Sequence, residues 1–160
     1  MSVLIDHLRM QVASAQRLLQ VLLAQRDAIR KQDAEGVLAR LGDVQAELAV
    51  RERIERERDD LLRSAGGRLG VAPEALHLDD LLTGTPGREA DEARALSAEL
   101  KGLLGEISQV HAQNKVLIRQ ELTFLDHLLR VLSGAPQGGY SAGGGFASSA
   151  SAYATVDARV

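Results

Sequence analysis

Residues 86–134 of this 160-residue chain read PGREADEARALSAELKGLLGEISQVHAQNKVLIRQELTFLDHLLRVLSG. Thr85 and Pro86 are typical of an N-cap and a first helical residue, and Gly134 is typical of the residue that follows a helix. We therefore predict one helix up to Ser133, which at 1.5 Å per residue is about 70 Å long. A helix of this length suits an elongated antiparallel bundle better than a compact globule.

Two further long helices are expected before it. No glycine or proline interrupts the chain from Val3 to about Lys31. The apolar residues of this stretch follow the alternating three- and four-residue spacing of a helical seam; they are Ile5, Leu8, Val12, Ala15, Leu19 and Leu22. Asp33 can cap a second helix, because its carboxylate can accept from the free amides of the next turn. We expect that helix to end at Gly66–Gly67.

A short leucine-rich element should follow, beginning at Pro73 and ending before Gly84. After Gly134 the chain is rich in Gly, Ser and Ala, and such a segment buries too little apolar surface to offset the cost of ordering. We therefore predict an all-α fold. Residues 1–134 form an elongated, coiled-coil-like antiparallel helical bundle with a long C-terminal helix, and residues 135–160 form a flexible tail.

Composition excludes several classes of protein. The formal net charge is -3 and aromatic residues make up only 2% of the chain, so neither phosphate neutralisation nor base stacking is expected to bind a nucleic acid. The chain has no cysteine, which excludes disulfides and thiolate metal sites. Residues 1–10 lack the apolar core of a signal peptide, and no apolar run is long enough to cross a membrane. We expect a cytoplasmic protein that does not insert into membranes.

The sequence offers no catalytic centre. No two histidines lie three or four residues apart, as a helical metal pair would require; the four are His7, His77, His111 and His127. The glycine cluster at 138–145 follows a helix, whereas a phosphate-binding loop would open one. We predict that the chain is not an enzyme and holds neither a metal nor a cofactor.

The end of the long helix is apolar over an unusually wide arc. On a 100°-per-residue wheel, nine residues span about 180°, whereas packing on one side of a bundle needs little over about 100°. These nine are Leu117, Ile118, Leu122, Phe124, Leu125, Leu128, Leu129, Val131 and Leu132. The surplus indicates that one flank is buried internally and the other binds a partner. The alternative is that the short element at 73–82 covers the extra arc.

Two polar residues, Asn114 and Glu121, fall inside this arc. A lone buried carboxylate is costly, so Glu121 requires a partner or access to water. If the first and last helices run parallel, Arg26 lies at a matching height, and we predict an Arg26–Glu121 pair that fixes the register of the bundle. Asn114 could fix the register in the same way, as seam asparagines do in coiled coils.

Three segments together resemble the FlgN family of flagellar type III export chaperones. Asn114-Lys115-Val116-Leu117-Ile118 and the leucines after it are similar to the family's last-helix pattern. Leu81-Leu82, after Asp79-Asp80, is similar to its middle segment, and Tyr140-Ser141-Ala142-Gly143-Gly144 to the Tyr-plus-Gly motif after the last helix. The resemblance covers about residues 3–145. The Gly/Ser/Ala tail after Phe146 departs from the family, and the resemblance implies no role for it.

The resemblance implies a cytosolic chaperone that binds the C-terminal helical segment of hook-associated (hook–filament junction) proteins and delivers it to the flagellar export gate and the export ATPase complex. It assigns cargo binding to the end of the last helix, at Asn114, Leu117, Ile118, Leu122, Leu125, Leu129 and Leu132. It assigns gate binding to Tyr140. Two other interpretations remain open: a homo-oligomeric structural coiled coil, and another secretion adaptor.

Overall fold

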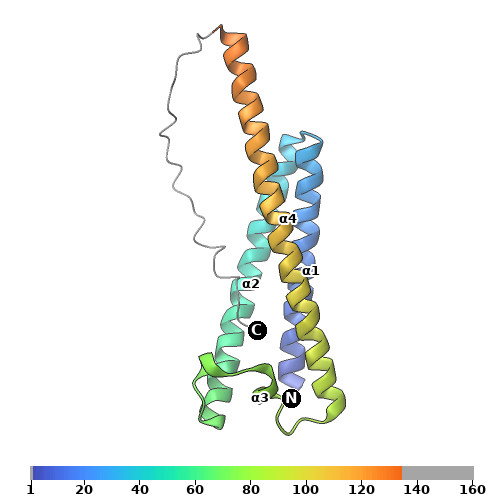
Figure 1. Cartoon of the computed structure of the whole chain (residues 1–160), viewed down its shortest axis with the longest axis vertical. Coiled ribbons are helices and arrows are strands. Elements are labelled where there is room, and N and C mark those ends of the chain that lie inside the picture. The colour runs from blue at the N-terminus through green and yellow to red at the C-terminus, as the bar shows by residue number, and fades with distance from the viewer. Residues whose placement is uncertain (1, 135–160) are drawn as a thin grey trace.

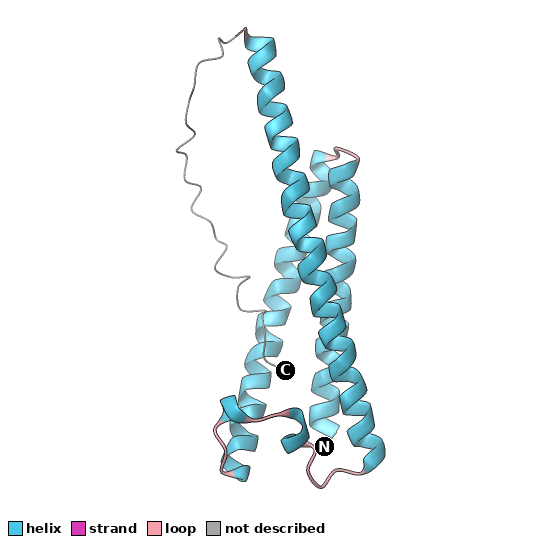
Figure 2. Ribbon diagram, in the orientation of Figure 1, coloured by secondary structure: helices cyan, strands magenta, loops and turns pink. Residues whose placement is uncertain are grey.

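The computed structural model describes residues 2–134. Over this range the elements are α1 (Ser2–Arg30), α2 (Ala34–Leu69), the short 3₁₀ helix η1 (Pro73–Ala75), α3 (Leu78–Leu81) and α4 (Gly87–Ser133). The described residues contain no strand, and only short connections join the helices (Figure 2). The predicted all-α fold with a long C-terminal helix is confirmed.

The three long helices run up, down and up (Figure 1). α1 and α2 form an antiparallel hairpin, and α4 packs beside α1 in the same direction. η1 and α3 lie at the end of the bundle where α1 begins, while the C-terminal part of α4 extends beyond the tip of the hairpin. α4 therefore has a packed part and a part that stands alone.

α1 is the central helix of the core, because it packs against both α2 and α4. One cluster joins all three long helices and consists of Val12, Ala15, Leu18, Leu22, Val44, Leu100, Ile107 and Val110. The other joins α1, the start of α4 and the residue after α3; it consists of Ile5, Leu8, Leu82, Ala90 and Ala93. The apolar seam predicted for α1 thus faces α4. No helix of residues 2–134 combines the length and hydropathy of a membrane span.

Local chemistry explains most helix ends. The predicted cap at Asp33 is confirmed, since its Oδ1 accepts from the Gly36 amide at 2.9 Å. Gly134 follows α4 with a left-handed backbone, φ 62°, as its position in the sequence predicts. The start of α4 differs by one residue: Pro86 is the N-cap and its carbonyl accepts from the Ala90 amide, while the Thr85 hydroxyl makes no cap bond.

The predicted end of α2 at Gly66–Gly67 is wrong. The helix continues to Leu69, and Gly70 supplies the left-handed residue with φ 67°. The chain then turns back over Gly66, whose carbonyl accepts from the Val71 amide at 3.1 Å. A Cβ at Gly66 would lie 2.6 Å from the Val71 carbonyl oxygen, so this glycine serves a close approach of two backbone segments.

Gly66 and Gly67 form a matched pair for a stability test. We expect Gly66→Ala to lower the free energy of unfolding by about 1–3 kcal/mol, because the added methyl overlaps backbone that cannot easily move. Gly67→Ala, where a Cβ would meet nothing within 4 Å, should raise it by up to about 1 kcal/mol through its helix propensity. Urea denaturation followed by circular dichroism measures both. Equal effects would contradict the close approach at Gly66.

Candidate partner-binding surface

Two contacts mark where α4 leaves the hairpin. Within the bundle, Asn114 Nδ2 donates to the Leu22 carbonyl at 2.9 Å and to Gln25 Oε1 at 3.2 Å. At the hairpin tip, Gln32 Nε2 donates to Glu121 Oε2 at 3.3 Å. Gln32 lies in the turn between α1 and α2, so α4 passes the tip at Glu121. The twelve residues that follow extend for about 18 Å beyond it.

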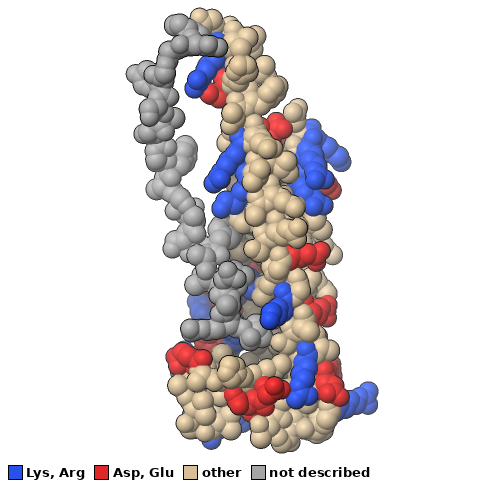
Figure 3. Space-filling model, in the orientation of Figure 1, with Lys and Arg blue, Asp and Glu red and all other residues tan. Residues whose placement is uncertain are grey.

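The part of α4 past the tip is exposed at every residue and largely apolar. We call residues 122–132 the distal segment. Its large apolar side chains are between 38 and 81% exposed; they are Leu122, Phe124, Leu125, Leu128, Leu129, Val131 and Leu132. In Figure 3 uncharged side chains make up most of the visible surface at this end of α4. Exposed apolar surface that is contiguous on this scale is typical of a site for another chain.

A narrow polar strip occupies the remaining side of the distal segment. Asp126 and Arg130 form an ion pair at 2.9 Å, one helix turn apart. The Thr123 hydroxyl donates to the Arg119 carbonyl at 2.9 Å, within its own helix. These groups satisfy one another along the helix, so they keep that side compatible with water.

The structure separates the seven residues predicted to bind cargo into three groups. The leucines at 122, 125, 129 and 132 are exposed on the distal segment. Leu117 and Ile118 are half-buried at the hairpin tip. Asn114 is only 1% exposed and is bonded to α1, so its predicted contact with cargo is not available while the bundle is folded. Phe124, Leu128 and Val131 belong to the same exposed surface and were missing from the predicted site, although they lie in the apolar arc that the sequence indicates.

The alternative that the short element at 73–82 covers the apolar arc is wrong. α3 lies at the opposite end of the bundle, where Leu82 is buried against Ile5 and Leu8. Nothing in residues 2–134 covers the distal segment, since every residue of it is exposed.

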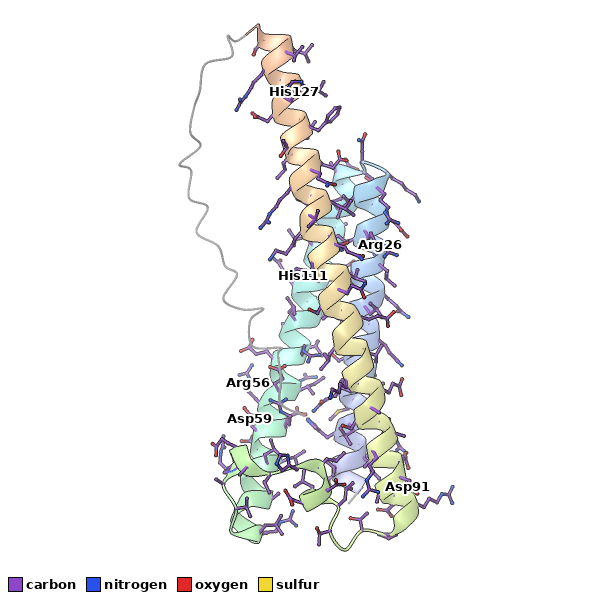
Figure 4. All side chains as sticks on the ribbon, in the orientation of Figure 1. Arg26, Arg56, Asp59, Asp91, His111 and His127 are labelled. Carbon is purple, nitrogen blue, oxygen red and sulfur yellow. The ribbon has the colours of Figure 1, made fainter. Side chains whose placement is uncertain are left out.

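The predicted Arg26–Glu121 pair is not formed. Glu121 bonds to Gln32 instead, and no ion pair in the described residues joins it to Arg26. Asn114–Gln25 and Glu121–Gln32 both link positions 89 residues apart, so α1 and α4 keep one register over this stretch. Arg26 lies within α1, a full helix turn before its end at Arg30, whereas Gln32 lies in the turn beyond that end. Figure 4 shows Arg26 on α1 within the bundle. Asn114, for which the sequence suggests the same register role, bonds to α1 in this register.

A hollow of about 760 Å³ lies at the other end of the molecule, between α1, α2 and the η1–α3 connection. Leucines and both His7 and His77 line it. Over residues 2–134 no group of three or more His, Asp or Glu side chains is placed to hold a metal ion. His111 and His127 lie far apart along α4 (Figure 4).

The pKa values of two histidines, His7 and His111, are lowered in the folded chain. Burial lowers the pKa of His7, with the Glu57 carboxylate raising it and the Arg58 guanidinium lowering it to smaller extents. His7 shares a hydrogen bond of 2.8 Å with Gln11 Nε2. Burial also lowers the pKa of His111, and Lys115 lowers it further. Both rings thus favour the neutral form in the folded chain.

Stability should therefore fall on mild acidification. The unfolded chain binds protons at these histidines near pH 6.5, whereas the folded chain binds them only at lower pH. The stability that the two neutral histidines contribute is fully present above about pH 6.5. It is lost as the pH falls toward their pKa values in the folded chain. We expect the double variant His7→Gln/His111→Gln to lose less stability than the unmodified chain between pH 7.5 and 5.5, measured by urea denaturation. Equal losses would show that other groups cause the pH dependence.

Comparison with known proteins shows to which family the chain belongs. The family model described as FlgN protein matches residues 1–147, which include Asn114, the distal segment and Tyr140. No curated protein and no solved structure matches the chain. Tyr140, predicted to bind the export gate, lies outside the described residues. Because the match spans most of the sequence, the chain belongs to the FlgN family of flagellar export chaperones.

Proposed function

We propose that this chaperone acts in the cytoplasm and binds the C-terminal helical segment of hook-associated proteins on the distal segment. The observation that supports this most directly is the run of large apolar side chains on α4 beyond the hairpin tip. An amphipathic helix that lies along a row of apolar residues spaced by three and four is a common mode of peptide recognition.

Burial supplies the binding energy in this proposal. Full burial of a leucine side chain contributes about 1.5–3 kcal/mol, and four leucines of the distal segment are each more than half exposed. Leu122, Leu125, Leu129 and Leu132 together could thus contribute several kcal/mol, against which the loss of rotational and translational freedom must be set. A cargo helix covered in this way cannot assemble prematurely, because the same apolar face is already occupied.

Delivery involves the tail in this proposal. Tyr140 lies six residues after Gly134, within the part of the chain that matches the family. We assign it to the export gate, with the export ATPase complex as a further partner. One end of α4 would then carry cargo, and the segment directly after it would contact the secretion machinery.

Charge introduced on the distal segment should abolish cargo capture. In Leu125→Glu/Leu129→Glu, carboxylates would be buried without partners against a cargo helix, and affinity should fall by about 100-fold or more. The helical circular dichroism should persist, because these side chains pack on nothing inside the bundle. The control Gln120→Glu/Thr123→Glu adds the same charge at exposed polar positions and should bind as the unmodified chain does.

Isothermal titration with a purified hook-associated protein measures this effect. Unfolding of the Leu125/Leu129 variant would favour a core role for these leucines. A stable symmetric dimer that buries residues 117–132 would instead favour the structural coiled-coil interpretation.

Substitution of Tyr140 should separate delivery from capture. We expect Tyr140→Ala to leave cargo affinity unchanged and to reduce both gate binding in the presence of cargo and secretion of the cargo. Tyr153→Ala is the control, because Tyr153 lies beyond the residues that match the family. Equal secretion from the two variants would count against the assignment of Tyr140.

A further inference from the structure

Two parallel rows of residues run along α4 and together contain every large apolar residue of the distal segment. The first row, which we call the inner seam, keeps an unbroken alternation of three- and four-residue steps along nearly the whole helix. It consists of Ala93, Leu96, Leu100, Leu103, Ile107, Val110, Asn114, Leu117, Glu121, Phe124, Leu128 and Val131. This is the spacing by which a helix presents one seam to one neighbouring helix.

The inner seam is filled by the bundle only up to the hairpin tip. Leu100, Ile107 and Val110 are buried in the core cluster that contains Val12 of α1 and Val44 of α2. Beyond the tip no other helix of residues 2–134 packs on this seam, and Leu128 and Val131 are 38 and 63% exposed. Within the described residues, the position that α1 occupies lower in the bundle is therefore unfilled along the distal segment.

The second row, the outer seam, begins at the hairpin tip and continues beyond the bundle. It consists of Ile118, Leu122, Leu125, Leu129 and Leu132, again at steps of three and four. Traced toward the N-terminus at the same spacing, it meets Lys115, His111 and Ser108, which are polar. The outer seam thus begins where the α1–α2 hairpin ends.

One docked helix fills one seam, which uses two positions in each heptad. The distal segment offers four positions in each heptad over the same axial length, so a single cargo helix would leave one complete seam in water. The polar strip with Asp126 and Arg130 closes the remaining side. The distal segment therefore has room for two helices and no more.

We propose that the cargo docks as a pair of helices, one on the outer seam and one on the inner seam. This deepens the proposed function and rests on it. The two cargo helices pack on α4 and on each other, and this extends the three-helix arrangement of the bundle past the hairpin tip. The helix on the inner seam continues the path of α1 and meets the turn at Gln32. About 18 Å of α4 accommodates roughly 12 residues of each cargo helix.

A second copy of the chaperone fits this surface less well. In a two-fold dimer of distal segments each copy presents one helix to the other, so one seam of each would stay bare. Two helices of one cargo polypeptide fill both seams and require only one association event, with its cost in translational and rotational freedom. The continuity of the inner seam with the buried α1–α4 interface also indicates that its occupant is a helix.

Site-specific cross-linking on the full-length chain tests the proposal. The photoreactive residue benzoylphenylalanine replaces either Leu129, on the outer seam, or Val131, on the inner seam, and Asp126 on the polar strip serves as the control position. After irradiation with a full-length hook-associated protein, mass spectrometry maps the cross-linked peptides. We expect positions 129 and 131 to attach to two separate cargo segments, and position 126 to neither.

The remaining outcomes separate a failure of the helix-pair proposal from a failure of the proposed function. Cross-links from both positions to one cargo segment would overturn the helix pair and leave the proposed function intact. Cross-links from position 131 to a second chaperone copy, or to residues 135–160 of the same chain, would also overturn it. The absence of cargo from all products would refute the proposed function itself.

A binding measurement provides an independent check. We expect Leu128→Ala/Val131→Ala, which alters the inner seam alone, to lower the affinity for the full-length cargo about tenfold. Both side chains are exposed in the free chaperone, so helical circular dichroism and urea stability should stay close to those of the unmodified chain. Gln120→Ala/Thr123→Ala is the control on the polar side. A folded inner-seam variant that binds as the unmodified chain would overturn the proposal.

Discussion

α1 has 29 residues and α4 has 47, and the two helices run in the same direction from the same end of the bundle. Because both helices begin at the same end of the bundle, α4 extends beyond the end of α1. The distal segment is the part of α4 that this difference in length places beyond the end of α1. Its leucines have the spacing of core residues, yet they are exposed because α1 and α2 have already ended. The proposed binding surface is thus a continuation of the core past the elements that cover it.

The position of Asn114 fixes how much of α4 extends beyond the tip. Its amide bonds to the Leu22 carbonyl and to Gln25 deep in the bundle, where an unpaired polar group would be costly. A slip of α4 by one heptad would remove both bonds. Asn114 thus favours the observed register, and the register sets the length of exposed helix. Leucines alone would allow several alignments of nearly equal energy.

Predictions that depend on local chemistry agree with the structure to within a few residues. Asp33 and Gly134 were identified because capping and left-handed backbone involve only neighbouring residues. Gly66 misled the prediction because its role is to let the Val71 carbonyl approach, a contact that exists only after the chain reverses. Arg26 and Glu121 were expected at the same height along the bundle, because the sequence does not give the register between α1 and α4. Their separation depends on packing between positions that are 95 residues apart in the sequence, which no local pattern encodes.

By itself the sequence determined that the chain is helical, where the long helices begin and end to within a few residues, and which residues of α4 are apolar. Hydrophobic spacing and capping are properties of short segments, and those segments carry them into any fold. Only the tertiary structure decided which apolar residues are core and which are surface. Leu100 and Leu128 both lie on the inner seam of α4, yet Leu100 is buried and Leu128 is exposed. The difference is the height at which the α1–α2 hairpin ends, and long-range packing alone sets that height.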